Sequence, residues 1–150
     1  MDCCALACQY HQEGYSCAQS VAEAFSDWTL LEPEELFAAE GGFGGGVGGS
    51  HEELCGAVSG GLLVLGLLYP HTKGTNREGK RAIHQMAKEF RERFGRAFGH
   101  TRYSNLLRAR PGAGEGTPAA LWMGLKAHCD IMIVTAVEVL EEQSGLASVE

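Results

Sequence analysis

Apolar residues recur every three to four positions along most of this chain, which is the spacing that one buried face of an α-helix produces. The clearest case is the segment 75–98, where an apolar stripe lies opposite a row of charged residues. The stripe consists of Ala82, Ile83, Met86, Ala87, Phe90, Phe94, Ala97 and Phe98. No run alternates polar and apolar residues between turn residues, so strands are not expected. The pattern predicts an all-α fold.

Capping residues mark where further helices begin. Ser16 and Gln19 have the spacing of a capping box, and so do Ser50 and Glu53. Gly145 suits the position just after the last helix. The main helices are expected over residues 17–28, 33–39, 51–69, 75–98 and 118–144, with short ones over 2–12 and 102–108. These elements predict a single domain, residues 1–150, folded as a compact bundle of five or six helices.

A glycine-rich loop precedes the third of these main helices. Seven of the nine residues in 41–49 are glycine, which permits positive φ angles and a close approach to the backbone. Because the run leads to Cys55, we interpret it as a loop that wraps around a sulfur atom rather than as a flexible linker. The candidate cofactor-contacting residues of this region are Gly44, Gly45, Gly46 and Gly56.

The segment 54–71 carries no charged residue. Its many glycines argue against a membrane span, so a buried helix is expected there. The pairs Gly56/Gly60 and Ala57/Gly61 place small residues four apart, which lets a second helix approach closely.

The composition fits a cytoplasmic protein of 150 residues with six cysteines. The first residues lack the basic and apolar regions of a secretory signal, so no signal peptide is expected. Thiols stay reduced in the cytoplasm, which makes these cysteines candidates for metal ligands, redox thiols or core residues rather than for a disulfide framework.

Positive charge is concentrated in one part of an acidic chain. The net charge is −7, yet eleven of the twelve Lys and Arg residues lie in 73–110 against only three Glu. That segment could bind an anionic partner, pair with the acidic part of a second subunit in a homodimer, or form an ordinary solvated helix face. Nucleic-acid binding is not favoured, because exposed aromatic residues are not interleaved with the basic ones.

Two of the cysteines are expected near helix starts. Cys17 would open its helix and Cys55 would lie within about a turn and a half of its helix start, where the backbone N–H groups stabilise a thiolate. Cys129 is expected in mid-helix on an apolar face. Cys4 and Cys8 are four residues apart and could form a separate thiol pair or metal clip, whereas His11 has no partner at ligand spacing.

Three motifs carry a resemblance to a known family. They are Gly14-Tyr-Ser-Cys17-Ala-Gln, Phe43-Gly-Gly-Gly-Val-Gly and Cys55-Gly-Ala-Val-Ser-Gly60. In this order and spacing they resemble the redox-active C_GCAxxG_C_C family, which has a Cys…Cys-Gly-Ala-x-x-Gly…Cys…Cys signature, over about residues 10–140. The resemblance implies an all-helical fold and four cysteines, and a related domain carries an iron–sulfur cluster. Cys17, Cys55 and Cys129 match the first, second and fourth cysteines.

The third cysteine of the signature is missing. Tyr103-Ser104-Asn105 stands where the resemblance places it, just before Leu106-Leu107. A fourth ligand beside Cys17, Cys55 and Cys129 could therefore come from other residues. The candidates are Tyr103, Ser104, His100, His51 and the N-terminal cysteines Cys3, Cys4 and Cys8.

Three hypotheses follow. The first is a thiol-based redox or metal protein, with Cys17, Cys55 and Cys129 as ligands of an iron–sulfur cluster or, alternatively, zinc. The second is a metal-free dithiol redox protein in which Cys17 and Cys55 are the catalytic pair. The third is a structural module that acts as a homodimer. The first two hypotheses also imply a redox partner protein.

Overall fold

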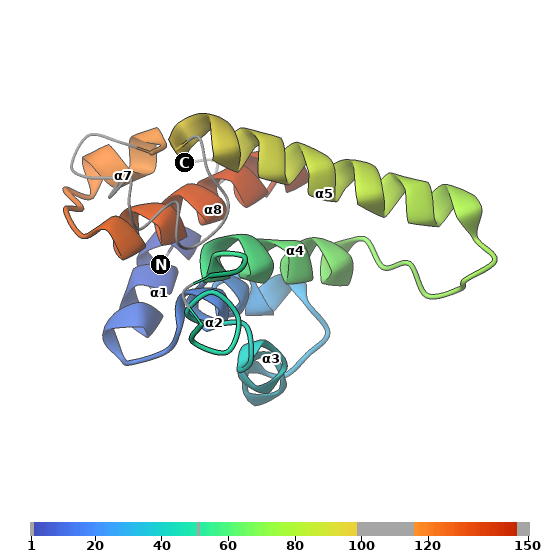
Figure 1. Ribbon diagram of the computed structural model, residues 1–150, viewed down its shortest axis with the longest axis horizontal. Coiled ribbons are helices and arrows are strands. Elements are labelled where there is room, and N and C mark those ends of the chain that lie inside the picture. The colour runs from blue at the N-terminus through green and yellow to red at the C-terminus, as the bar shows by residue number, and fades with distance from the viewer. Residues whose placement is uncertain (1, 51, 99–115, 147–150) are drawn as a thin grey trace.

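The computed structural model describes residues 2–50, 52–98 and 116–146, and within these ranges the chain forms helices and no strand (Figure 1). The all-α prediction is therefore confirmed. The elements are α1 (Cys3–Gln12), α2 (Cys17–Glu23), the 3-10 helix η1 (Ser26–Trp28), α3 (Pro33–Glu40), α4 (Gly56–Leu68), α5 (Arg77–Phe98), α7 (Pro118–Trp122) and α8 (His128–Ser144). The expected helix over 102–108 lies outside the described residues.

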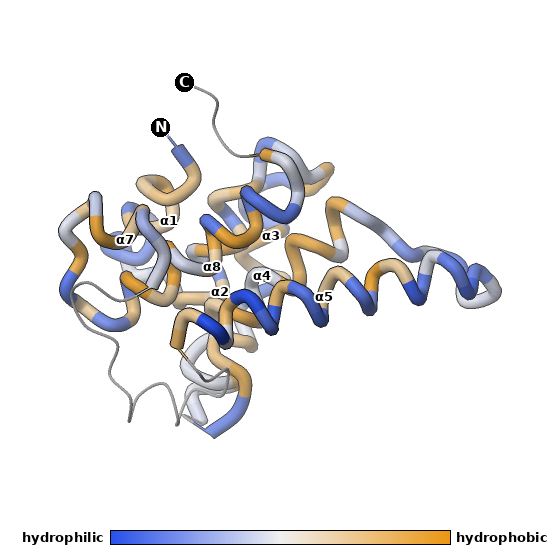
Figure 2. The backbone as a smooth tube through the Cα atoms, turned by 90° about the horizontal axis from the view of Figure 1, so that it is seen from above, coloured by the Kyte–Doolittle hydropathy of each residue, from blue (hydrophilic) through white to orange (hydrophobic). Residues whose placement is uncertain are grey.

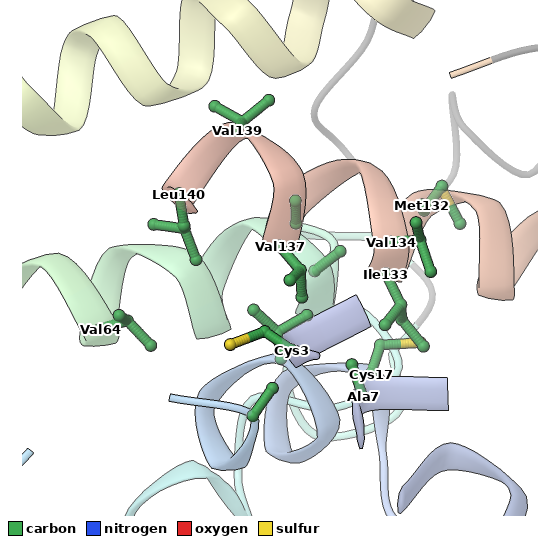
Figure 3. Close-up of a cluster of buried hydrophobic side chains, with 14 of the residues drawn as sticks. Cys3, Ala7, Cys17, Val64, Met132, Ile133, Val134, Val137, Val139 and Leu140 are labelled. Atoms are coloured by element: carbon green, nitrogen blue, oxygen red, sulfur yellow. The ribbon is translucent and has the colours of Figure 1, made fainter. Parts of the chain in front are cut away.

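Helix α8 is the centre of the bundle. It packs against α1, α2, α4, α5 and α7, and Figure 1 shows it between α5 on one side and α1 and α2 on the other. Every residue from Ile131 to Val137 is buried, so α8 is apolar around most of its circumference. Figure 3 shows Ile133 and Val137 directed at Cys17, Ala7 and Cys3 of the N-terminal helices.

Local capping fixes the N-terminal helices as expected. Asp2 accepts a hydrogen bond from the Ala5 N–H at 2.8 Å and caps α1. Ser16 and Gln19 form the predicted capping box at the start of α2. The helix over 17–28 is shorter than expected, because α2 ends at Glu23 and Trp28 lies in η1 with 44% of its surface exposed.

The start of α4 differs from the prediction. Ser50 does not cap a helix, because its hydroxyl donates to the Gly46 carbonyl within the glycine-rich loop. The helix begins six residues later, at Gly56, with Cys55 as its N-cap. The loop therefore extends to Cys55. The prediction that Cys55 lies inside the helix was wrong.

The expected final helix over 118–144 is two helices. Gly124 adopts a φ of +65°, a left-handed conformation that ends α7 and that glycine adopts without strain. The chain then turns and restarts as α8 at His128. Seven helices are thus described, more than the five or six expected. Gly145 ends α8 with a φ of +72°, as predicted.

Small residues let α4 lie directly on its neighbours. A Cβ atom on Gly60 would be 2.6 Å from the Ala18 carbonyl oxygen of α2, and one on Gly61 would collide with the Phe90 ring of α5. The predicted role of the small residues in close helix packing is confirmed. None of the described helices combines the length and the apolarity that a bilayer crossing needs.

Candidate thiol site

Each of the three cysteines that match the family signature lies at the start of a helix. Cys17 is the first residue of α2, Cys55 is the N-cap of α4, and Cys129 is the second residue of α8. The prediction that Cys129 lies in mid-helix was wrong, because the break at Gly124 moves the helix start next to it. The backbone N–H groups of a first helical turn lack intrahelical partners and favour a negative charge nearby.

Two glycines bring the start of α2 against the chain around Cys55. A Cβ atom on Gly56 would lie 3.1 Å from the Cys17 Cβ and 2.9 Å from the Ala18 nitrogen. A Cβ atom on Gly44 would lie 2.6 Å from the Cβ of Ser16, the residue before Cys17. The glycine-rich loop therefore packs on the N-cap residue of α2. This packing explains two of the glycines without any bound group.

The thiols of Cys17 and Cys129 share a hydrogen bond. Because the Cys17 S–H donates to a Cys129 thiolate, it lowers the pKa of Cys129, and the positive charges of His128 and His11 lower it further, to about 6. The same hydrogen bond and burial raise the pKa of Cys17 far above its usual range. The first proton lost by the pair therefore comes from Cys129.

Exposure also separates these thiols. Cys129 is half-buried, whereas Cys17 is 9% exposed and Cys55 is inaccessible. Burial raises the pKa of Cys55 to about 11, although the N–H groups of Ala57 and Val58 act in the opposite direction. Of the three, only Cys129 combines access with thiolate character.

A histidine and an aspartate from opposite ends of the chain meet beside Cys129. His11 Nδ1 lies 2.9 Å from Asp130 Oδ1, and both side chains are about one quarter exposed. His11 lies in the last turn of α1 and Asp130 in the first turn of α8, so each position suits the charge of its side chain. Sequence spacing did not indicate this pair, because its members are 119 positions apart.

The N-terminal cysteines form a separate group of buried thiols. Cys3, Cys4 and Cys8 are each at most 7% exposed. Burial raises the pKa of Cys4, and the Glu141 carboxylate, to which the Cys4 thiol donates at 3.6 Å, raises it further. Burial also raises the pKa of Cys8, to about 11. These thiols pack between α1 and α8 as core residues.

The three predicted metal ligands, Cys17, Cys55 and Cys129, lie in the described part of the chain. Within the described ranges, no three His, Cys, Asp or Glu side chains are grouped closely enough to hold a metal. The candidate fourth ligands Tyr103, Ser104, His100 and His51 lie outside those ranges.

The rest of the glycine-rich loop is a series of tight turns. Gly45, Gly46, Gly48 and Gly49 have φ angles between +61° and +75°, and so does Val47, at +67°. A β-branched residue in this region is strained. The conformation explains why the loop is rich in glycine, and the expected cofactor contacts of Gly44, Gly45, Gly46 and Gly56 stay a prediction.

A known family model matches most of the chain. Residues 15–143 match the family model described as "Putative redox-active protein (C_GCAxxG_C_C)". No curated protein and no solved structure matched the chain.

Proposed function

Since the chain belongs to the C_GCAxxG_C_C family of redox-active proteins, we propose that it carries out thiol–disulfide exchange through Cys129 and Cys17. The proposal rests on the packing of α2 against α8, which brings these two thiols together at the starts of the two helices, so that Cys17 lowers the pKa of Cys129. The dithiol hypothesis from the sequence paired Cys17 with Cys55, whereas this proposal pairs Cys17 with Cys129.

Cys129 is the attacking thiol. Its lowered pKa means that a large fraction is thiolate at neutral pH, and it is the most exposed of the three residues. The thiolate is the nucleophile in exchange reactions, and a thiol with a pKa near the ambient pH attacks fastest.

The reaction needs a disulfide, which we take to be that of a redox partner protein or a small-molecule disulfide. The Cys129 thiolate attacks one sulfur of that disulfide, a Cys129 mixed disulfide forms, and the other substrate sulfur leaves as a thiolate. Cys17 then loses its proton and attacks the Cys129 sulfur. The Cys17–Cys129 disulfide forms, the second substrate thiolate leaves, and the substrate has gained the two electrons that the protein has lost.

His11 and Asp130 support the charge on Cys129. The 2.9 Å contact with Asp130 fixes the His11 ring near the start of α8. A protonated ring there stabilises the Cys129 thiolate, while the Asp130 carboxylate alone would oppose it. The pair therefore holds an imidazole ring beside the attacking sulfur.

Cys55 stays a thiol in this scheme. It is inaccessible and its pKa is raised to about 11, so it is a poor nucleophile towards an external disulfide.

Three further proposals rest on the sequence and are separate from this one. They are a metal centre on Cys17, Cys55 and Cys129, a homodimer, and a cytoplasmic location.

Trapping the mixed disulfide tests the mechanism. Reduced protein is incubated with oxidised glutathione, and adducts are located by mass spectrometry of peptides. In Cys17→Ser the glutathione adduct should accumulate on Cys129, because the resolving thiol is absent. In Cys129→Ser no adduct should form on Cys17 at a comparable rate.

Cys3→Ala is the matched control, since Cys3 is a buried thiol of the N-terminal group. It should behave like the wild type. Adducts that form on Cys55, or equally on all six cysteines, would refute the assignment. Iron, zinc and acid-labile sulfide are measured on the same protein purified without oxygen, and a metal bound to these thiols would favour the metal proposal instead.

A further inference from the structure

Helix α5 carries a straight row of basic side chains on its solvent side. Five exposed residues follow one another at spacings of four, three, four and three, which keeps them on one helix face. They are Arg77, Arg81, His84, Lys88 and Arg91, and Lys80 lies beside the row. We call these six residues the cationic row. It extends over about 21 Å of helix.

Two hollows border the cationic row and meet at His84. One has a volume of about 530 Å³ and is lined by Leu62 of α4 together with His84, Ala87, Lys88, Arg91 and Glu92. The other, about 390 Å³, is lined by Arg77, Lys80, Arg81 and His84. Leu62 and Ala87 give the larger hollow an apolar floor between charged walls.

The row projects beyond the bundle. Figure 1 shows the N-terminal half of α5 extending past the end of α8, and Figure 2 shows hydrophilic residues recurring along it. A hydrogen bond to α8 lies further along α5, where the Gln143 side chain donates to the Met86 carbonyl at 2.7 Å. The cations are therefore open to a partner.

Within the described residues, none of the Lys and Arg side chains of the row has an ion-pair partner. Arg93, on another face of α5, is by contrast paired with Glu89 at 2.7 Å and Glu142 at 3.7 Å. Like charges three and four residues apart destabilise a helix. A partner that supplies negative charge would remove this cost.

We propose that the cationic row and its two hollows are the docking surface for an acidic amphipathic helix of a partner protein. Carboxylates every three to four residues on such a helix match the spacing of the row. A leucine-type side chain between them would enter the hollow floored by Leu62 and Ala87. The chain has a net charge of −7, so the row is where an acidic partner is attracted rather than repelled.

Charge and position disfavour two other occupants. The larger hollow is lined in part by the apolar Leu62 and Ala87, which suit an apolar side chain of a helix and offer nothing to a phosphate backbone. In a second copy of this chain, the exposed acidic helix is α3, which Figure 1 shows on the opposite side of the bundle from α5. That pairing would be head-to-tail and would not close into a dimer.

The test uses a fluorescein-labelled helical peptide of about 15 residues, with one leucine stripe flanked by glutamates, and a scrambled peptide of identical composition. Fluorescence anisotropy should show that the helical peptide binds at least about tenfold more tightly than the scrambled one. Raising the salt from about 20 mM to about 200 mM should weaken binding several-fold. The double variant R81E/K88E should weaken binding by about tenfold or more.

Lys126→Glu is the matched control, because Lys126 is an exposed cation outside the row. It should bind the peptide like the wild type, and circular dichroism checks that both variants fold. Equal binding of the scrambled peptide, or undiminished binding to R81E/K88E, would overturn the proposal. Tighter binding of a DNA duplex than of the helical peptide would also overturn it. A dimer of the wild type in light scattering that R81E/K88E abolishes would do the same. The outcome does not depend on the thiol chemistry.

Discussion

At the scale of single residues, the acidity of Cys129 is set mainly by one neighbour. The Cys17 S–H is the largest cause of the lowered pKa of Cys129. Replacing Cys17 with Ala removes this donor, so the pKa of Cys129 should rise by about one to two units. The measurement is the rate of alkylation by iodoacetamide as a function of pH, with the labelled cysteine identified by mass spectrometry.

Cys17→Ser is the control for this experiment, because its hydroxyl can still donate a hydrogen bond to the thiolate. Its alkylation profile should stay closer to that of the wild type than the profile of Cys17→Ala. Identical profiles for the wild type and Cys17→Ala would show that the hydrogen bond does not set the pKa.

Glu40 makes the stability depend on pH. Its side chain is inaccessible, neither carboxylate oxygen has a hydrogen-bond partner in the described part of the chain, and burial raises its pKa from 4.5 to about 8. Between these values the folded state keeps a proton that the unfolded chain has lost. The contribution of Glu40 to stability therefore falls as the pH rises from 4.5 to about 8 and is constant above it.

We expect Glu40→Gln to raise the Tm relative to the wild type by about 3–8 °C at about pH 9, and by much less at about pH 5. Differential scanning calorimetry measures both. The comparison with the wild type is needed because the lowered pKa of Cys129 acts in the opposite direction. The exposed Glu34→Gln serves as the control, and a gain that does not change with pH would contradict the account.

The sequence singled out three cysteines but did not show how they are arranged in space. Cys17, Cys55 and Cys129 were candidates because of their motifs. The hydrogen bond from Cys17 to Cys129 and the contact of His11 with Asp130 depend on how α1, α2 and α8 pack. Local periodicity carries no information on such tertiary contacts.

At the scale of the elements, the glycines of α4 are not equivalent. A Cβ atom on Gly60 would lie 2.6 Å from the Ala18 carbonyl oxygen, whereas one on Gly66 would meet no atom within 4 Å. Gly60→Ala should therefore lower the free energy of unfolding by about 1–3 kcal/mol. Gly66→Ala should raise it by about 0.5–1 kcal/mol, because alanine reduces the entropy of the unfolded chain.

Urea denaturation of the two alanine variants measures both effects in the same helix. Equal changes in the two variants would mean that helix propensity, rather than the contact with α2, decides the outcome. A destabilised Gly60→Ala should also change the environment of Cys17, because Ala18 is its neighbour in α2.

The capping box of Ser16 and Gln19 predicted the start of α2. Two later boundaries were wrong for identifiable reasons. Ser50 has the sequence of an N-cap, but its hydroxyl is used inside the glycine-rich loop. The apolar spacing of 118–144 continues across Gly124, so periodicity did not reveal that the backbone turns there. Both errors moved a cysteine away from the helix start at which it lies.

At the scale of the whole molecule, α8 connects the early and late helices into one core. We expect the chain to unfold in a single transition, because the loss of α8 would expose the buried faces of the five helices that it packs against. In a Trp122→Phe background, the emission of Trp28 and the helical circular dichroism should have the same urea midpoint. Separate midpoints would contradict a single domain.

Ile133→Ala, in the buried centre of α8, should lower both midpoints together and cost about 2–4 kcal/mol. The matched control is Leu121→Ala, because the Leu121 side chain of α7 is 62% exposed. It should change the free energy of unfolding by less than about 0.5 kcal/mol.

Disulfide mapping by mass spectrometry, over a series of redox buffers from reducing to oxidising, tests the central claim most directly. The account predicts that the first disulfide to appear joins Cys17 and Cys129, with Cys55 and the N-terminal cysteines still reduced. A first disulfide between Cys17 and Cys55, or among Cys3, Cys4 and Cys8, would contradict it.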